Sequence, residues 1–189
     1  RAVRFAARFG FTIEPATLQW LREALASQRL ASISRQRVRH EIELMCQEEH
    51  PGRGLLLAAE LGIWSSLLPG WEPLRAPLLD DDRLDTHLAG WSDIVAARWT
   101  MRHQLALCCL FGGLPAAQHA TLTQQLAFTR QRALLLEAIQ EQGRSTHAAL
   151  VALRSSGEAL PSPSAVHSVL GAVSLAALVF FDLIWDQSP

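Results

Sequence analysis

The sequence contains no lysine, and all 17 of its basic residues are arginine. With many alanines and leucines, this composition is typical of genome base bias rather than of a particular function. Cysteine is also scarce: Cys46, Cys108 and Cys109 are an odd number with no framework spacing. This excludes a disulfide scaffold, favours a reducing compartment and predicts a cytoplasmic location. Cys108 and Cys109 lie in an apolar run and are predicted to be small core residues.

Familiar catalytic motifs are missing as well. There is no glycine-rich phosphate loop, no His-Glu-x-x-His and no nucleophile elbow. The one carboxylate cluster, Asp80 to Asp82, consists of adjacent residues in a sequence typical of a loop, whereas metal-assisted catalysis needs carboxylates that converge from rigid elements. The seven histidines are scattered. We therefore predict no catalytic residue and no metal site in this chain.

Long apolar runs are absent too. The most apolar stretch, residues 169–181, is shorter than the roughly 20 residues that span a bilayer, and it ends at Asp182. It predicts a buried terminal helix and no membrane partner. The six tryptophans, a high number, are interpreted as core and corner packing.

What remains is an ordinary globular composition, 49% hydrophobic and 19% charged over 189 residues. Leucine and alanine dominate and strand-like alternation is absent, so we predict an all-α array, or superhelix, of short helices. Glycines and prolines punctuate the pattern. The predicted helices cover 1–9, 15–26, 34–48, 51–62, 61–68, 91–111, 115–128, 130–142, 145–155, 164–170 and 174–185.

The segment 69–82 contains three prolines followed by three aspartates. Such a segment is typical of a linker, so we predict two helical domains, residues 1–70 and 71–189. Charge divides along similar lines. Residues 1–39 carry a net charge of +6, and residues 40–189 carry −7. The basic end indicates an anionic partner such as RNA or nucleotide phosphate, unless it is simply a solvated helix face.

Arginines form a row in the first helix. At about 100° per residue, Arg1, Arg4 and Arg8 share a stripe about 60° wide. The apolar face comprises Ala2, Val3, Phe5, Ala6 and Phe9. Guanidinium groups in a row repel one another, so they face either an anion or carboxylates from a part of the protein upstream of this sequence.

Three motifs in residues 1–70 resemble a known family. They are RAVRFAARFGF followed by TIEPATLQWLREAL, then SRQRVRHE from Ser34, then PGRGLLL from Pro51 with ELGIW and LLP. Together they resemble the neck of class II tRNA nucleotidyltransferases, which include CCA-adding, CC-adding and A-adding enzymes and the related bacterial poly(A) polymerases. Residues 71–189 resemble the helical body and tail of this family only in their all-α class, and no specific motif is shared.

The resemblance implies an RNA-binding and nucleotide-templating part of an enzyme that adds C or A residues to the tRNA 3′ end. The family's head domain holds the Mg²⁺ and the CTP or ATP, and its motifs are not found in this sequence. We therefore expect the chain to be inactive alone, and to have the tRNA 3′ end and a head domain as partners. Two alternatives stay open: a bacterial poly(A) polymerase fragment, and a helical protein-interaction scaffold without a nucleic-acid role.

The resemblance also implies roles for individual residues. Arg1, Arg4 and Arg8 match the family's neck-helix arginines, which are expected to face the nucleotide pocket or the RNA 3′ end. In the second motif, Arg37 and Glu41 match the family pattern and are expected to form a structural ion pair within their helix or between helices. Gln36 replaces the family's usual glutamate. Arg35 and Arg39 share the adjacent helix face, as candidates for RNA phosphate contact or as plain surface arginines.

Overall fold

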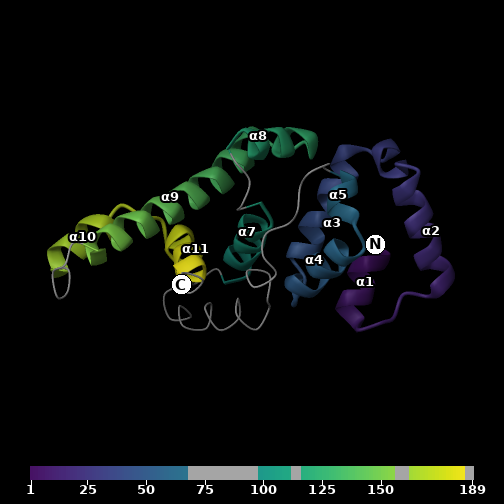
Figure 1. Ribbon diagram of the computed structural model, residues 1–189, viewed down its shortest axis with the longest axis horizontal. Helices are drawn as coiled ribbons and strands as arrows, with labels where there is room; N and C mark the ends of the chain where they lie inside the picture. Colours follow the sequence, from purple (N-terminus) through teal and green to yellow (C-terminus); the bar gives the residue numbers. More distant parts are fainter. Residues whose placement is uncertain (68–97, 112–115, 156–161, 186–189) are drawn as a thin grey trace.

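The computed structural model describes residues 1–67, 98–111, 116–155 and 162–185 (Figure 1). Within these ranges every regular element is a helix, and no strand occurs. The predicted all-α class is confirmed, and the helices follow one another as an extended array (Figure 1). The predicted domain boundary at 69–82, with the three aspartates, lies outside the described residues.

The first group of helices begins and ends where local signals predict. Pro15 and Pro51 each occupy a first-turn position, where the missing N–H costs nothing. Gly10 and Gly62 adopt positive φ angles of 66° and 72° at helix ends, as glycine readily does. The elements are α1 (Ala2–Phe9), α2 (Pro15–Ala26), the short 3₁₀ helix η1 (Arg29–Ser32), which was not predicted, α3 (Arg35–Cys46), α4 (Pro51–Glu60) and α5 (Ile63–Leu67).

The second group contains α7 (Arg98–Phe111), α8 (Ala116–Gln125), α9 (Arg130–Ser155), α10 (Pro163–Leu170) and α11 (Leu175–Trp185). The prediction of two helices at 130–142 and 145–155 is wrong, because α9 is continuous through Gly143. This glycine is buried against Phe180 of α11, where an added Cβ would lie 2.7 Å from the ring. Gly143 therefore permits close helix packing instead of ending a helix.

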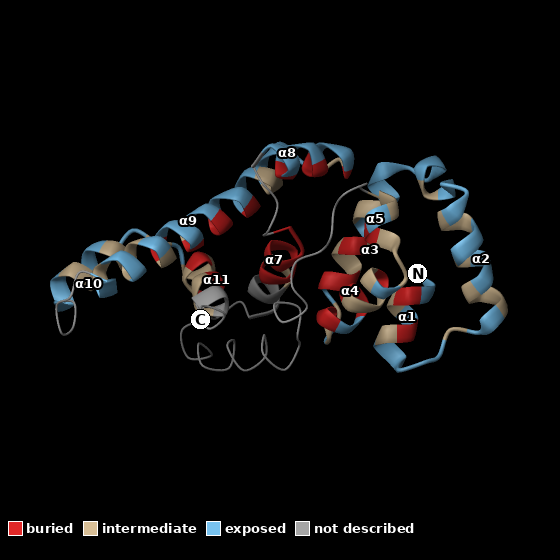
Figure 2. Cartoon of the chain, viewed as in Figure 1, coloured by how far each residue is buried: buried red, intermediate tan, exposed pale blue. Residues whose placement is uncertain are grey.

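Helix α7 joins the two groups. Its residues 105–111 are all buried, and it contacts α3 and α4 as well as α9 and α11 (Figure 2). The predicted core role of Cys108 and Cys109 on α7 is confirmed, since both are buried, and Cys46 on α3 is buried as well. Burial raises the pKa of the Cys46 thiol and of the Cys108 thiol, so both stay protonated near neutral pH.

The tryptophan prediction is right for one residue and wrong for another. Trp64 is buried, and its indole N–H donates a hydrogen bond to the carbonyl oxygen of Leu55 at 3.0 Å. Trp20 on α2 is 66% exposed, because α2 buries none of its residues. Trp71 and Trp91 lie outside the described residues.

Among the described residues, no single helix is long and apolar enough to cross a membrane. Helix α10 and residues Leu175–Asp182 of α11 together meet the length and composition required, but they are bent by 115° at their junction. In the structure Ala177, Val179 and Phe180 of α11 are buried, as expected for a terminal helix packed on the protein.

Candidate functional site

Helix α1 presents two different faces to its surroundings. Val3 and Ala6 are buried, and α1 packs on α4. Phe5 and Phe9, expected on the same apolar face, are instead 42% and 54% exposed. Their rings stack at a centroid distance of 6.2 Å, and Phe9 stacks on Phe11 at 5.4 Å. Small residues thus form the buried side of α1, and phenylalanines line the outer side beside the arginines.

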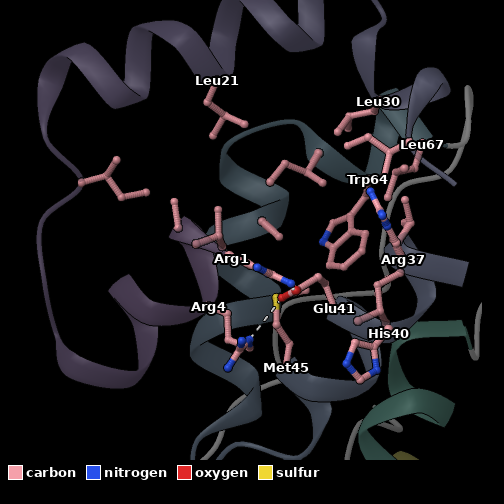
Figure 3. Close-up of a pocket in the computed structure, with 18 of the residues that line it drawn as sticks. Arg1, Arg4, Leu21, Leu30, Arg37, His40, Glu41, Met45, Trp64 and Leu67 are labelled. Carbon is pink, nitrogen blue, oxygen red and sulfur yellow. Dashed lines mark hydrogen bonds and ion pairs between the residues drawn. The ribbon is translucent and has the colours of Figure 1, made fainter. Parts of the chain in front are cut away.

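The arginine row of α1 lies against two carboxylates from the α3 segment. Glu41 accepts a hydrogen bond from Nε of Arg1 at 2.8 Å and from Nε of Arg4 at 3.3 Å (Figure 3). Glu48 accepts from Nη1 of Arg4 at 2.9 Å and lies 3.5 Å from Nε of Arg8. The row is therefore paired with carboxylates, but these come from within the chain and not from an upstream part.

Glu48 was missed in the sequence, although a signal for it exists. It lies seven residues after Glu41, a spacing that returns to nearly the same side of a helix. Two acids seven residues apart can pair with a row of arginines that are three and four residues apart on a facing helix, as Arg1, Arg4 and Arg8 are. Glu48 itself lies just beyond the end of α3 at Cys46.

Exposure divides the arginine row into a buried centre and two exposed ends. The Arg4 side chain is 11% exposed, whereas those of Arg1 and Arg8 are 78% and 51% exposed. Burial opposes ionisation of both Arg4 and Glu41, but their mutual hydrogen bonds prevail. Hydrogen bonds from Arg1 and Arg4 lower the pKa of Glu41, and those to Glu48 and Glu41 raise the pKa of Arg4.

The predicted neck-motif pair does not form within its own helix. No ion pair joins Arg37 to Glu41 among the described residues, because Glu41 turns toward α1 and pairs with Arg1 and Arg4. Glu41 thus makes a helix-to-helix ion pair. Arg37 is exposed on α3 and lines a neighbouring cavity.

Arg35 and Arg39 occupy different environments although they share a helix face. Arg35 is exposed. The Arg39 side chain is 24% exposed, donates to the carbonyl oxygen of Ala127 and lies 5.8 Å from the ring centre of Phe128. Arg39 therefore connects α3 to the turn between α8 and α9.

A cavity of about 820 Å³ lies between α1, α2 and α3 and reaches η1, α4 and α5. Leu21 of α2 points into it, and Trp64 forms part of the opposite wall (Figure 3). Apolar side chains dominate the lining, and its charged or titratable members are Arg1, Arg4, Arg37, His40 and Glu41. The sequence pattern gave no prediction of this cavity, because the cavity depends on how far α2 lies from α1.

The described residues offer no cluster of metal ligands. Among them, no group of three or more histidine, cysteine, aspartate or glutamate side chains could hold a metal ion. The donor set of these residues thus does not fit a magnesium site.

Comparison with known proteins gives matches to the N-terminal helices. Residues 10–74 match a family model described as "Probable RNA and SrmB-binding site of polymerase A". A multifunctional CCA protein of Nitrosomonas europaea is 38% identical over 69 residues, which is 36% of this chain and 17% of the relative. An A-adding tRNA nucleotidyltransferase of Halalkalibacterium halodurans is 36% identical over 73 residues, 36% of this chain and 16% of the relative. The matched part is thus less than a fifth of each relative.

Solved structures match almost the whole chain. A CCA-adding enzyme in its apo form II superposes with a TM-score of 0.73 and 18% identity, over 96% of this chain and 41% of that one. A tRNA-processing enzyme complex gives a TM-score of 0.70 and 17% identity, over 98% of this chain and 49% of its own.

The chain therefore has the fold of the helical part of a CCA-adding enzyme. The resemblance to the class II tRNA nucleotidyltransferases and related bacterial poly(A) polymerases is confirmed for the N-terminal helices, which the family model matches at residues 10–74 and the curated relatives match over 36% of the chain.

Proposed function

We propose that this chain is the RNA-binding and nucleotide-templating part of a tRNA nucleotidyltransferase that adds C or A residues, or both, to the tRNA 3′ end. The observation that carries the proposal is the exposed guanidinium surface of α1 and α3, which adjoins or lies within the RNA-binding match at 10–74. The proposed reaction, addition of nucleotides to tRNA, is taken from the names of the relatives, a multifunctional CCA protein and an A-adding tRNA nucleotidyltransferase. A cytoplasmic location accords with this function.

The ion pairs leave some guanidinium nitrogens available for RNA. Arg1 and Arg8 each approach a carboxylate through Nε, so their terminal nitrogens can donate to phosphate oxygens. Arg35 has no carboxylate partner within the described ranges. We propose that these three arginines contact phosphate. Arg4 and Arg39 were predicted beside them, and we propose that both act mainly by holding α1 and α3 in place.

The nucleotide and the metal need another part of the enzyme. Magnesium neutralises the charge that develops on the phosphates during nucleotidyl transfer, and carboxylates must hold it. Since the described residues offer no such cluster, we propose that a head domain supplies Mg²⁺ and CTP or ATP binding, and that this chain alone is inactive. Incubation with tRNA, Mg²⁺, CTP and ATP should then give no extended product, and any extension would contradict this point.

Salt-dependent tRNA binding tests the proposed surface. Replacing Arg1, Arg8 and Arg35 together by alanine should weaken binding and reduce the slope of log affinity against log salt by about 2 to 3, because each phosphate contact contributes roughly 0.7 to 0.9. A matched triple variant replaces Arg22, Arg29 and Arg53, which are exposed arginines with the same total charge. It should have a much smaller effect. Equal losses in both variants, or no binding at low salt, would contradict the proposal.

The family description names polymerase A, and this wording favours one second candidate, a part of a bacterial poly(A) polymerase. Product length separates the two. In a complete enzyme that contains this chain, addition of a few nucleotides supports tRNA maturation, whereas a long adenosine tail supports the polymerase.

A further inference from the structure

The side chain of Arg39 joins the two groups of helices. It lies on α3, and its Nη1 donates a hydrogen bond to the carbonyl oxygen of Ala127, in the turn between α8 and α9. The guanidinium also lies 5.8 Å from the ring centre of Phe128. Only 24% of the side chain is exposed, and Nε, which lies 3.8 Å from a carboxylate oxygen of Glu43, is buried. Groups of the protein thus surround the guanidinium and leave little of it open to a phosphate.

The turn that Arg39 contacts closes the end of α8 tightly. Ala127 has a φ of 52°, in the left-handed region that residues with a Cβ seldom adopt. The N–H of Phe128 donates to the carbonyl oxygen of Thr123 at 2.9 Å, and that of Ala127 donates to Gln124 at 3.0 Å. A cation at this place is favourable, because the C-terminus of a helix carries a partial negative charge. Arg39 therefore stabilises the conformation in which α8 ends and α9 begins.

Helix α3 connects this turn to the arginines of the first group. Arg35 lies one turn before Arg39 on the same face of α3. The same helix carries Glu41, which pairs with Arg1 of α1. Beyond the turn, α9 begins at Arg130, which is exposed and has no carboxylate partner among the described residues. Because Arg39 fixes α3 against the turn, the place of Arg130 relative to Arg35 depends on the Arg39 side chain.

We propose that Arg39 is a positioning residue, which holds Arg130 of the second helix group in place relative to Arg35 so that one tRNA contacts both. The Arg39 guanidinium acts through Ala127 and Phe128 and does not itself touch the RNA. This inference rests on the proposed function, because it extends the RNA-contacting surface of α3 onto α9. It adds a phosphate contact at Arg130, and it makes that contact depend on a hydrogen bond inside the protein.

A double-mutant cycle with a tRNA transcript and the full chain tests the positioning role. Arg130→Ala should weaken binding about three- to tenfold in the wild-type background. Arg39→Met keeps a long side chain beside Phe128 but removes the donor, and in this background Arg130→Ala should change affinity less than about twofold. Arg53→Met, at an exposed arginine of α4, is the matched background in which the effect of Arg130→Ala should persist. A full effect of Arg130→Ala in Arg39→Met, or no effect in wild type, would overturn the proposal.

A distance measurement between the helix groups tests the same role without RNA. Nitroxide labels at Glu60→Cys on α4 and Gln118→Cys on α8 occupy exposed positions, and the native cysteines are buried. The distance distribution from electron spin resonance should broaden or shift in Arg39→Met and stay unchanged in Arg53→Met. Arg39→Lys, which keeps the charge but not the planar guanidinium, should give an intermediate result, and it serves both measurements should Arg39→Met not fold.

The two measurements separate this inference from the proposed function. A distance distribution in Arg39→Met that equals the wild-type distribution would overturn the positioning role alone. Absence of tRNA binding by the unaltered chain would contradict the proposed function and, with it, the contact at Arg130. If Arg39 contacts phosphate directly, Arg39→Met should reduce the salt dependence of binding and leave the Arg130→Ala effect intact, which would also overturn the proposal.

Discussion

Glu48 bridges Arg4 and Arg8: one carboxylate oxygen lies 2.9 Å from Nη1 of Arg4, and the other lies 3.5 Å from Nε of Arg8. The bridge connects α1 to the chain just beyond α3, at a point where the Glu48 side chain is only 15% exposed. Glu41 bridges the preceding pair of arginines, Arg1 and Arg4, in the same way. Arg4 belongs to both bridges, so the two carboxylates fix the orientation of the whole row.

Glu48→Gln should therefore lower the free energy of unfolding by about 1 to 3 kcal/mol, since it leaves the largely buried Arg4 guanidinium with one charged partner instead of two. Urea unfolding at neutral pH measures the change. Glu49→Gln is the matched control, because the neighbouring Glu49 is exposed, and it should change stability by less than about 0.5 kcal/mol. Equal effects of the two substitutions would show that the bridge contributes little.

The Glu41 carboxylate should make stability depend on acid. Burial alone would raise its pKa, but hydrogen bonds from Arg1 and Arg4 lower the pKa below the ordinary 4.5. The unfolded chain therefore takes up this proton at a higher pH than the folded chain, and the contribution of Glu41 is present above about pH 4.5 and lost as pH falls through its folded pKa. Stability measured from pH 7 to pH 3 should show wild type and Glu41→Gln converging at the acidic end. A constant difference between them would contradict this account.

Local signals in the sequence predicted helix boundaries well. Gly10, Pro15, Pro51 and Gly62 act through their own backbone geometry, which needs no information about distant residues. Gly143 shows the limit of such signals, because its role depends on Phe180 packing against it from another helix. A glycine between two apolar segments looks the same in sequence whether it ends a helix or packs against an aromatic ring of another helix.

The candidate site was predicted in composition but not in arrangement. The helical row of Arg1, Arg4 and Arg8 follows from spacing alone, whereas its pairing with Glu41 and Glu48 depends on how α1 lies beside α3. The roles of these arginines in RNA binding stay predictions. The cavity beside α2 was missed for the same reason, because an empty volume is a property of several helices together.

His103 provides a second pH dependence, in a different range. Burial and the nearby Arg132, whose Nη2 lies 3.3 Å from Nδ1, lower the pKa of His103 to about 4. Because the unfolded histidine titrates near 6.5, the unfolded chain binds this proton first, and stability should fall as pH decreases from about 6.5 to 4. His103→Gln should remove up to one proton from the uptake that accompanies unfolding in this range. An unchanged pH profile in the variant would contradict the assignment.

Gly54 in α4 and Gly143 in α9 are both buried, but they should respond differently to alanine. At Gly143 a Cβ would lie 2.7 Å from Cδ1 of Phe180, a ring that is 2% exposed and has little room to move. The resulting overpacking outweighs the roughly 1 kcal/mol that alanine gains in a helix, so Gly143→Ala should lower the free energy of unfolding by about 1 to 2 kcal/mol. At Gly54 the same Cβ would meet Ala7 and Met45 at 3.7 Å, which is ordinary contact. Gly54→Ala should therefore leave stability unchanged or raise it by up to about 1 kcal/mol. Urea unfolding of both variants beside wild type tests the pair, and stabilisation by Gly143→Ala would show that α9 and α11 do not pack as closely as described.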